Sequence, residues 1–87
     1  MNKSDFREKV MQGINKAFMC VKIQTEGSSG YETIVNPVEN FTNKLAYYET
    51  AYNEDLELIS AKSAGKTIRI VDVLMTSNLN DLNWFCY

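Results

Sequence analysis

Hydrophobic residues near the start of the chain recur with the period of an α-helix. Phe6 and Val10 begin an apolar series that returns every three or four positions, with charged and polar residues between its members. This spacing places the apolar side chains on one side of a helix. We therefore predict an amphipathic helix over residues 5–18, with Ser4 or Asp5 capping its first backbone N–H groups.

The pattern then changes from helical to alternating. Val21 and Ile23 alternate with polar residues in the stretch 20–26, and a second alternating stretch covers residues 31–35. Residues 27–30, with the sequence Gly-Ser-Ser-Gly, separate the two stretches. Two alternating stretches with a short glycine-containing connection predict a β-hairpin.

A second helix is predicted directly after the hairpin. Asn36 is a favourable N-cap residue, Pro37 suits the first helical position, and Glu39 completes a capping-box arrangement. The apolar residues that follow fall within an arc of about 80° on a helical projection. They are Val38, Phe41, Leu45, Tyr48, Tyr52, Leu56 and Ile59.

The sequence leaves two possibilities for the end of this helix. The apolar series continues unbroken to Ile59, which favours one long helix ending at Lys62, before Gly65. The alternative ends the helix near Asn53 and makes residues 56–60 a strand. We prefer the long helix because its period is kept throughout.

Residues 66–75 are rich in β-branched side chains and predict a third strand, expected to be the most buried. The order α-β-β-α-β with a short C-terminal segment predicts an α+β fold. In it, a three-stranded, mainly antiparallel sheet packs its helices on one face. A chain of 87 residues is expected to form a single domain, residues 1–87. The apolar residues 84–87 are expected to cover the other face of the sheet or one edge.

Charge is distributed unevenly along a chain whose net charge is −2. Residues 23–60 carry one lysine and seven carboxylates, whereas the segments on either side are mildly basic. A negative surface releases no counterions from a phosphate backbone, so this segment favours a protein partner with a basic surface over nucleic acid. A nucleic-acid-binding module that uses the N-terminal helix is kept as an alternative. Its basic residues are Lys3, Arg7, Lys9 and Lys16.

The sequence also bears on location and redox state. No apolar run approaches the length of about 20 residues that crosses a membrane, and the first ten residues lack the apolar segment of a signal peptide. We therefore expect a cytoplasmic protein without a membrane partner. In a reducing compartment, Cys20 and Cys86 are expected to be buried free thiols and not a disulfide.

Few residues suited to catalysis or metal binding are present. The chain contains no histidine, which removes the commonest general base and zinc ligand, and its two cysteines are 66 positions apart. No serine or cysteine stands in a pattern typical of an activated nucleophile. In phosphate-binding loops the glycines precede a helix, whereas the glycines of residues 27–30 join two predicted strands. We therefore expect a protein that is not an enzyme and that has no cofactor, metal site or catalytic residue.

Three tyrosines stand among carboxylates in the predicted second helix. On a helical projection Tyr48 and Tyr52 belong to the apolar face, whereas Tyr47 falls on the outer side near Leu58. Tyrosine bordered by carboxylates is typical of a protein recognition surface. Two alternatives stay open, in which residues 84–87 cover this surface or a homodimer buries it. The predicted partner-binding residues are Tyr47, Glu54, Glu57 and Leu58.

Residues 36–71 resemble small proteins encoded by phages and prophages of Gram-positive bacteria. The resemblance is carried by the helix opening NPVEN (36–40), the segments LAYY (45–48) and AYNEDL (51–56), and the strand IRIV (68–71). Small acidic proteins of this type are often inhibitors of host machinery, and anti-CRISPR proteins are one such class. The resemblance therefore implies a non-enzymatic inhibitor in the host cytoplasm that binds a host protein, such as a defence nuclease. A small structural or regulatory homodimer is the alternative.

Overall fold

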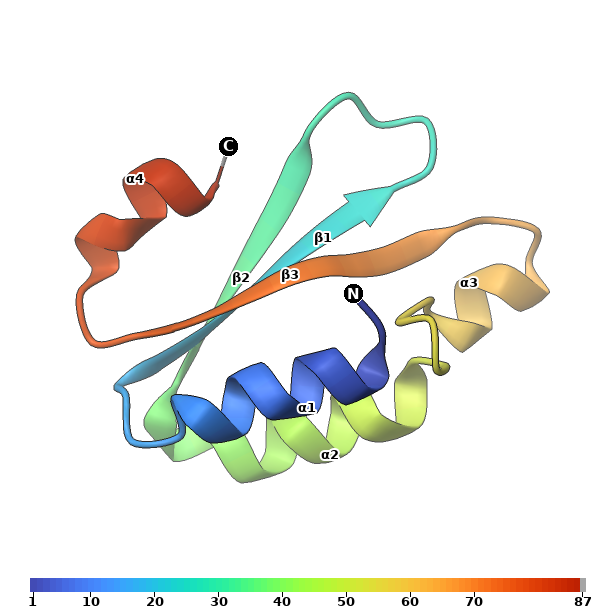
Figure 1. Cartoon of the computed structure of the whole chain (residues 1–87). Helices are drawn as coiled ribbons and strands as arrows, with labels where there is room; N and C mark the ends of the chain where they lie inside the picture. Colours follow the sequence, from blue (N-terminus) through green and yellow to red (C-terminus); the bar gives the residue numbers. More distant parts are fainter. Residues whose placement is uncertain (87) are drawn as a thin grey trace.

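The computed structural model describes residues 1–86, which form an α+β fold with the predicted order of helices and strands (Figure 1). Two short 3-10 helices, labelled η, accompany the main elements. The elements are α1 (Lys3–Gln12), β1 (Phe18–Thr25), β2 (Tyr31–Pro37), η1 (Val38–Asn40), α2 (Phe41–Ala51), α3 (Ile59–Ser63), β3 (Ile68–Thr76), η2 (Leu79–Asp81) and α4 (Leu82–Phe85). The predicted fold class and the predicted β-hairpin are confirmed.

The three strands form one antiparallel sheet in the order β2-β1-β3, so β1 is the central strand. Val21 of β1 lies opposite Ile34 of β2 and Val73 of β3. Residues 19–23 of β1 are all buried, whereas both outer strands are partly exposed. The prediction that the third strand is the most buried is therefore wrong, because β3 lies at an edge of the sheet.

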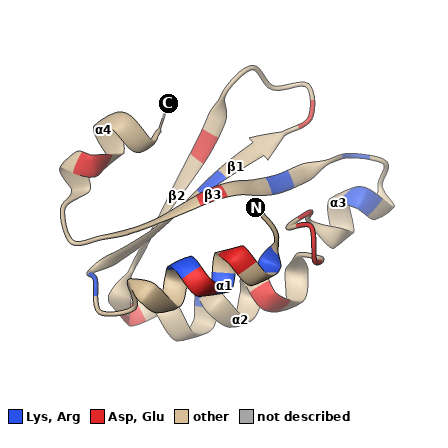
Figure 2. Ribbon diagram, in the orientation of Figure 1, with Lys and Arg blue, Asp and Glu red and all other residues tan. Residues whose placement is uncertain are grey.

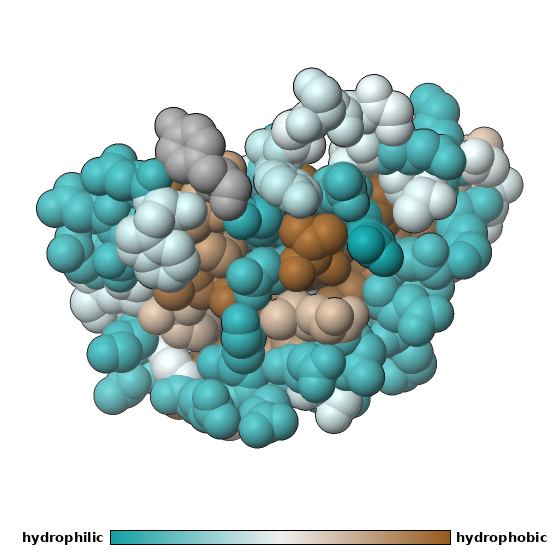
Figure 3. All heavy atoms as spheres, turned by 45° about the horizontal axis from the view of Figure 1, so that its top comes forward, coloured by the Kyte–Doolittle hydropathy of each residue, from teal (hydrophilic) through white to brown (hydrophobic). Residues whose placement is uncertain are grey.

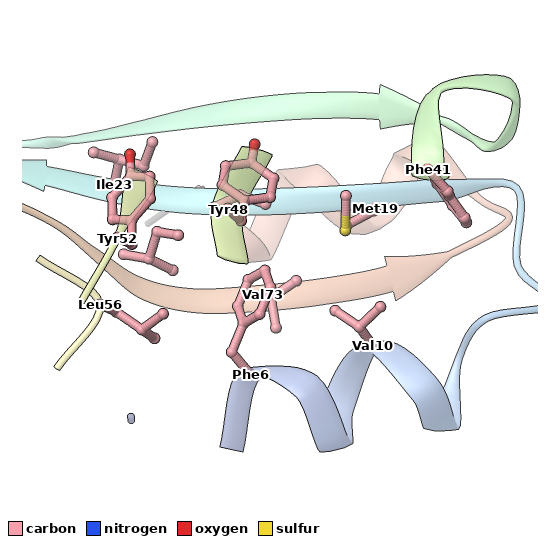
Figure 4. Packing of buried hydrophobic residues seen from close by; sticks show 11 residues of the cluster. Phe6, Val10, Met19, Ile23, Phe41, Tyr48, Tyr52, Leu56 and Val73 are labelled. Atoms are coloured by element: carbon pink, nitrogen blue, oxygen red, sulfur yellow. The ribbon is translucent and has the colours of Figure 1, made fainter. Parts of the chain in front are cut away.

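The helices α1 and α2 lie side by side on one face of the sheet (Figure 1). Phe6 of α1 and Tyr48 of α2 point toward each other beneath the strands, with ring centroids 5.7 Å apart (Figure 4). The predicted packing of helices on one face is confirmed. The core between the helices and the sheet consists of Phe6, Val10, Met19, Val21, Ile23, Phe41, Tyr48, Tyr52, Leu56, Ile70 and Val73.

The first helix is shorter than predicted at its C-terminal end. It stops at Gln12 because Gly13 is buried against β3, where an added Cβ would lie 2.3 Å from Met75 Cβ. Its N-cap is Asn2, whose side chain accepts from Asp5 N–H while the Asp5 carboxylate accepts from Asn2 N–H. Asp5 is therefore the third helical residue of a capping box and not the cap itself.

The second helix begins later than predicted. Asn36 and Pro37 are the last residues of β2, and α2 starts at Phe41 after the η1 turn. The side chain of Asn36 is buried and donates to Met19 O (3.2 Å) and Tyr48 Oη (3.3 Å). The predicted Asn36 cap is wrong because this amide serves the buried interface between β2 and α2.

The prediction of one long helix ending at Lys62 is also wrong, because α2 ends at Ala51. Lys3 Nζ donates to Glu49 O (2.7 Å) and to Tyr52 O, and so caps the helix C-terminus from α1. The chain then turns on Asn53, whose Oδ1 accepts from Asp55 N–H (2.9 Å) and Glu57 N–H (3.0 Å).

Residues 56–58 form neither a helix nor a regular strand. Leu56 has a φ of 61°, a left-handed conformation that is unusual for leucine, and its side chain is fully buried. The next residues form isolated antiparallel bridges, Glu57 with Arg69 and Leu58 with Tyr52. The alternative of a strand over residues 56–60 is therefore wrong as a regular strand, because only isolated bridges form at Glu57 and Leu58 and α3 begins at Ile59.

The C-terminal segment lies on the opposite face of the sheet from α1 and α2 (Figure 1). Phe85 is buried there, with Lys22 Nζ 4.8 Å from its ring and 5.0 Å from the Tyr31 ring. Of the two predicted places, the other face or an edge, Phe85 takes the other face, whereas Trp84 is 61% accessible and Tyr87 lies outside the described residues. Seen from this side, apolar side chains gather in a hollow among hydrophilic residues (Figure 3).

Both cysteines of the chain are free thiols. Cys20 is buried in β1, and burial raises the pKa of its thiol, whereas Cys86 is only partly buried. Within residues 1–86, no helix combines the length and the apolar character needed to cross a membrane.

Candidate protein-binding surface

Tyr47 lies on the exposed side of α2, and 47% of its surface remains accessible. Its ring packs edge-on against Tyr48 (centroids 5.4 Å apart) and Tyr52 (6.2 Å), and Lys44 Nζ lies 5.8 Å from it. The two neighbouring tyrosines are buried, so they fix the position of the exposed ring. Tyr47 is therefore held rigidly at the surface.

The other three predicted partner-binding residues lie in the turn after α2. Glu57 accepts from Lys62 Nζ (2.6 Å) and from Asn53 Nδ2 (3.2 Å), and the bond from Lys62 lowers the pKa of its carboxyl group. Leu58 is partly buried against the core. Glu54 is exposed, and its carbonyl accepts from the backbone N–H of Lys3.

These placements separate the four residues into two pairs. Tyr47 and Glu54 are exposed, whereas Glu57 and Leu58 serve the turn and the core. The predicted placement of Tyr47 beside Leu58 depended on a continuous helix, and that helix ends at Ala51. The described C-terminal residues do not cover Tyr47 either, because α4 and α2 lie on opposite faces of the sheet (Figure 1).

A second group of exposed apolar residues lies on β2, which the sequence analysis did not single out. Tyr31, Ile34 and Val35 are 48%, 38% and 37% accessible, although all three belong to a strand. Within the described sheet, β2 pairs only with β1. The alternating pattern predicted this strand, but only the strand order shows that it lies at an edge.

The exposed residues of β2 and α2 flank the β2 edge from its two faces: Ile34 and Tyr47 lie on the helix side, whereas Tyr31 and Val35 lie on the face that carries α4. The bond between Asn36 and Tyr48 places α2 beneath β2, and Ile34 is two residues from Asn36 on the same face of the strand. Tyr47 adjoins Tyr48 on the side of α2 away from α1, because Glu49 faces α1 through Arg7. We call Tyr31, Ile34, Val35 and Tyr47 the β2–Tyr47 surface.

Acidic residues lie along the β2 edge, while Lys22 Nζ lies 5.0 Å from the Tyr31 ring and Lys44 Nζ 5.8 Å from the Tyr47 ring. Between Lys22 and Lys44 the only charged side chains are Glu26, Glu32 and Glu39. Figure 2 shows acidic residues on β2 and on the loops at both of its ends. Three of the seven carboxylates of residues 23–60 therefore lie on or next to β2, and the other four lie in α2 and the turn that follows it.

The tyrosine hydroxyls next to this surface stay protonated at neutral pH. Burial raises the pKa of Tyr52 to about 12 and also raises the pKa of Tyr48, whose hydroxyl accepts from Asn36. Neither group is suited to act as a general base. In residues 1–86, no three histidine, cysteine or acidic side chains are grouped so that they could hold a metal ion.

The basic residues of α1 are engaged in contacts within the chain. Lys3 is buried at the end of α2, and Arg7 donates two hydrogen bonds of 2.6 Å to the Glu49 carboxylate, which lowers the pKa of that carboxyl group. Lys9 Nζ lies 2.9 Å from Asp72 Oδ1. Three of the four basic residues considered for nucleic-acid binding thus have partners on this chain.

The comparisons with known proteins give no match: no family model, curated protein or solved structure is significantly similar to this chain. The case for the β2–Tyr47 surface therefore rests on its geometry and charge.

Proposed function

We propose that this chain is a non-enzymatic protein that binds another protein through the β2–Tyr47 surface. The observation that carries the proposal is the rigidly held, exposed Tyr47 on the helix side of an edge strand that exposes Tyr31, Ile34 and Val35 and contains Glu32. Such a surface fits a partner with a basic surface. In line with the resemblance to phage proteins, the partner would be a host protein that is inhibited, such as a defence nuclease.

The physical argument concerns what Tyr47 gains on binding. Its ring is already ordered by Tyr48 and Tyr52, so little conformational entropy is lost when a partner covers it. Aromatic residues of this kind dominate the energetics of many interfaces, and their truncation costs about 2 kcal/mol or more. The glutamates contribute orientation and a faster encounter with a basic partner.

Affinity capture from the lysate of a Gram-positive host tests this proposal. Tyr47→Ala should reduce capture of the main partner at least about tenfold. Ile59→Ala is the matched control, because Ile59 is equally exposed at 47% but lies outside the surface. Capture by Tyr47→Ala at the wild-type level would contradict the proposed surface.

A further inference from the structure

We propose that the partner binds as an extended basic segment that adds a fourth strand to the sheet along β2, with a lysine or arginine beside Glu32. This inference rests on the proposed function and specifies the partner's conformation and charge. It follows from the hydrogen bonding, regularity and charge of β2.

The first step is the direction of the backbone groups of β2. Val38 N–H donates to Ala17 O (2.9 Å), immediately beyond the pair formed by Phe18 and Pro37. In an antiparallel pair, residues that bond to the neighbour alternate with residues that point away from it. Counting back from Val38, residues 32, 34 and 36 face β1. Tyr31, Thr33 and Val35 direct their N–H and C=O groups outward.

The second step is that this outer side is open. In the described part of the chain, no backbone hydrogen bond from another segment reaches residues 31, 33 or 35. Residues 31–36 contain no lysine, arginine or proline, so the outward row of backbone groups is unblocked up to Pro37, the last residue of β2. The irregularity of the sheet lies between β1 and β3, at Lys22 and Ile23, so β2 keeps regular pairing.

The third step is the side-chain environment that an added strand would meet. On the helix side it would run past Ile34 toward Tyr47, and on the other side past Tyr31 and Val35. The hydroxyl of Thr33 is buried and has no hydrogen-bond partner among the described residues. An incoming segment with alternating β-branched residues would fit both sides of this edge.

Charge favours a basic segment over a second copy of this chain. Glu32 lies on the helix face of β2, with Glu26 and Glu39 beyond the two ends of the strand, whereas Lys22 of β1 lies on the other face, 5.0 Å from the Tyr31 ring. Pairing β2 with its own copy would bring the glutamates of two chains together, whereas a lysine or arginine beside Glu32 forms an opposite-charge pair across the strands. The observations therefore favour a different protein with a basic extended segment.

The test uses synthetic peptides of about ten residues, the upper length of a typical strand. In one set valine and threonine alternate with lysine, and in the matched set glutamate replaces lysine. At low salt, fluorescence anisotropy should show the lysine set binding at least about tenfold more tightly. Glu32→Lys should weaken binding of the lysine set and strengthen binding of the glutamate set.

Val35→Pro tests the backbone bonds, because it removes an outward N–H without removing a bond to β1. It should weaken binding of the lysine peptides about tenfold, whereas Val35→Thr, which keeps the N–H, should bind them like the wild type. Bound peptide should also slow hydrogen exchange at the amides of Thr33 and Val35. Equal binding by the two Val35 variants, or no binding of either peptide set, would overturn strand addition.

The capture experiment separates this inference from the proposed function. If Tyr47→Ala loses the captured protein but Val35→Pro retains it, the surface is correct and strand addition is wrong. If both variants retain it, the surface itself is wrong. A wild-type dimer in light scattering that Val35→Pro converts to a monomer would assign the edge to a second copy and overturn the basic segment.

Discussion

The two edges of the sheet differ in how their backbone groups are treated. At the β3 edge, residues 56–58 run alongside the strand: Ile70 N–H donates to Leu56 O (2.9 Å) and Leu58 N–H donates to Ile68 O (2.7 Å). At the β2 edge, no described segment plays this role. The chain thus closes one edge with its own residues and leaves the other available, which is where backbone recognition of a partner is feasible.

Residues 56–58, which we call the covering segment, depend on the turn that follows α2 for their position beside β3. Lys3 ends that helix, Asn53 reverses the chain, and Leu56 is buried in a left-handed conformation. Nothing comparable follows β2, because the chain passes from Pro37 directly into η1 and α2. The contrast between the edges can therefore be tested by weakening the residues that cover β3.

The largest effect is expected from Leu56→Ala. Leu56 is fully buried in the core (Figure 4), and truncation of such a leucine typically costs about 2–5 kcal/mol through lost burial and the cavity left behind. Urea unfolding measures the change in the free energy of unfolding. Ile59→Ala, at an exposed position next to the covering segment, is the control and should cost less than about 1 kcal/mol. A smaller loss for Leu56→Ala than for the control would contradict this account.

The next effect is a loss of stability at high pH. The pKa of Tyr52 is about 12 in the folded protein, above the value of about 10 for an exposed tyrosine. The unfolded state therefore loses its proton first, so the free energy of unfolding should fall between about pH 10 and pH 12. The expected loss is up to about 2–3 kcal/mol.

Tyr52 forms an antiparallel β-bridge with Leu58 of the covering segment. Ionisation of Tyr52 should therefore destabilise the β3 side of the molecule. Unfolding free energies measured by urea titration across this pH range test the prediction. Tyr52→Phe should flatten the profile, and an unchanged slope in this variant would contradict the assignment to Tyr52.

Lys3→Met should have a smaller effect. This variant keeps most of the side-chain length but leaves the carbonyls of Glu49 and Tyr52 without their buried donor. The expected loss is about 1–3 kcal/mol in urea unfolding. Lys44→Met removes an exposed lysine of α2 and is the control. Equal stability of the two variants would show that Lys3 does not cap this helix.

The smallest effect is expected from Asn53→Ala. It removes the side-chain bonds to the backbone N–H groups of Asp55 and Glu57, for a loss of about 1–2 kcal/mol. Because the turn holds the covering segment, hydrogen exchange should quicken at the amides of Leu58 and Ile70. The amides of residues 32 and 34, which face β1, are the internal reference. Equal acceleration at all four amides would indicate general destabilisation and not an uncovered β3 edge.

Local patterns in the sequence predicted the hairpin and the positions of its strands. Alternation and the connection at residues 27–30 are local features, and the structure confirms them. The fate of Asn36 could not be predicted in this way. It stands where a helix cap is expected, yet its amide bonds to Met19 and Tyr48, residues that only the folded chain brings near it.

The sequence by itself determined the α+β order, the core-facing residues Phe41, Leu45 and Tyr48 of α2 and the acidic middle of the chain, because each depends on near neighbours. Val38 and Ile59, predicted for the same apolar face, are instead 51% and 47% accessible, because the helix does not extend to them. Only the tertiary structure decided where α2 ends and which strand lies at an open edge. Lys3 reaches the end of α2 from a position 46 residues away, and β1 takes the centre of the sheet by pairing with β3 as well as with β2. Such contacts follow from packing the whole chain, so the exposed edge of β2 beside Tyr47 appears only in the folded protein.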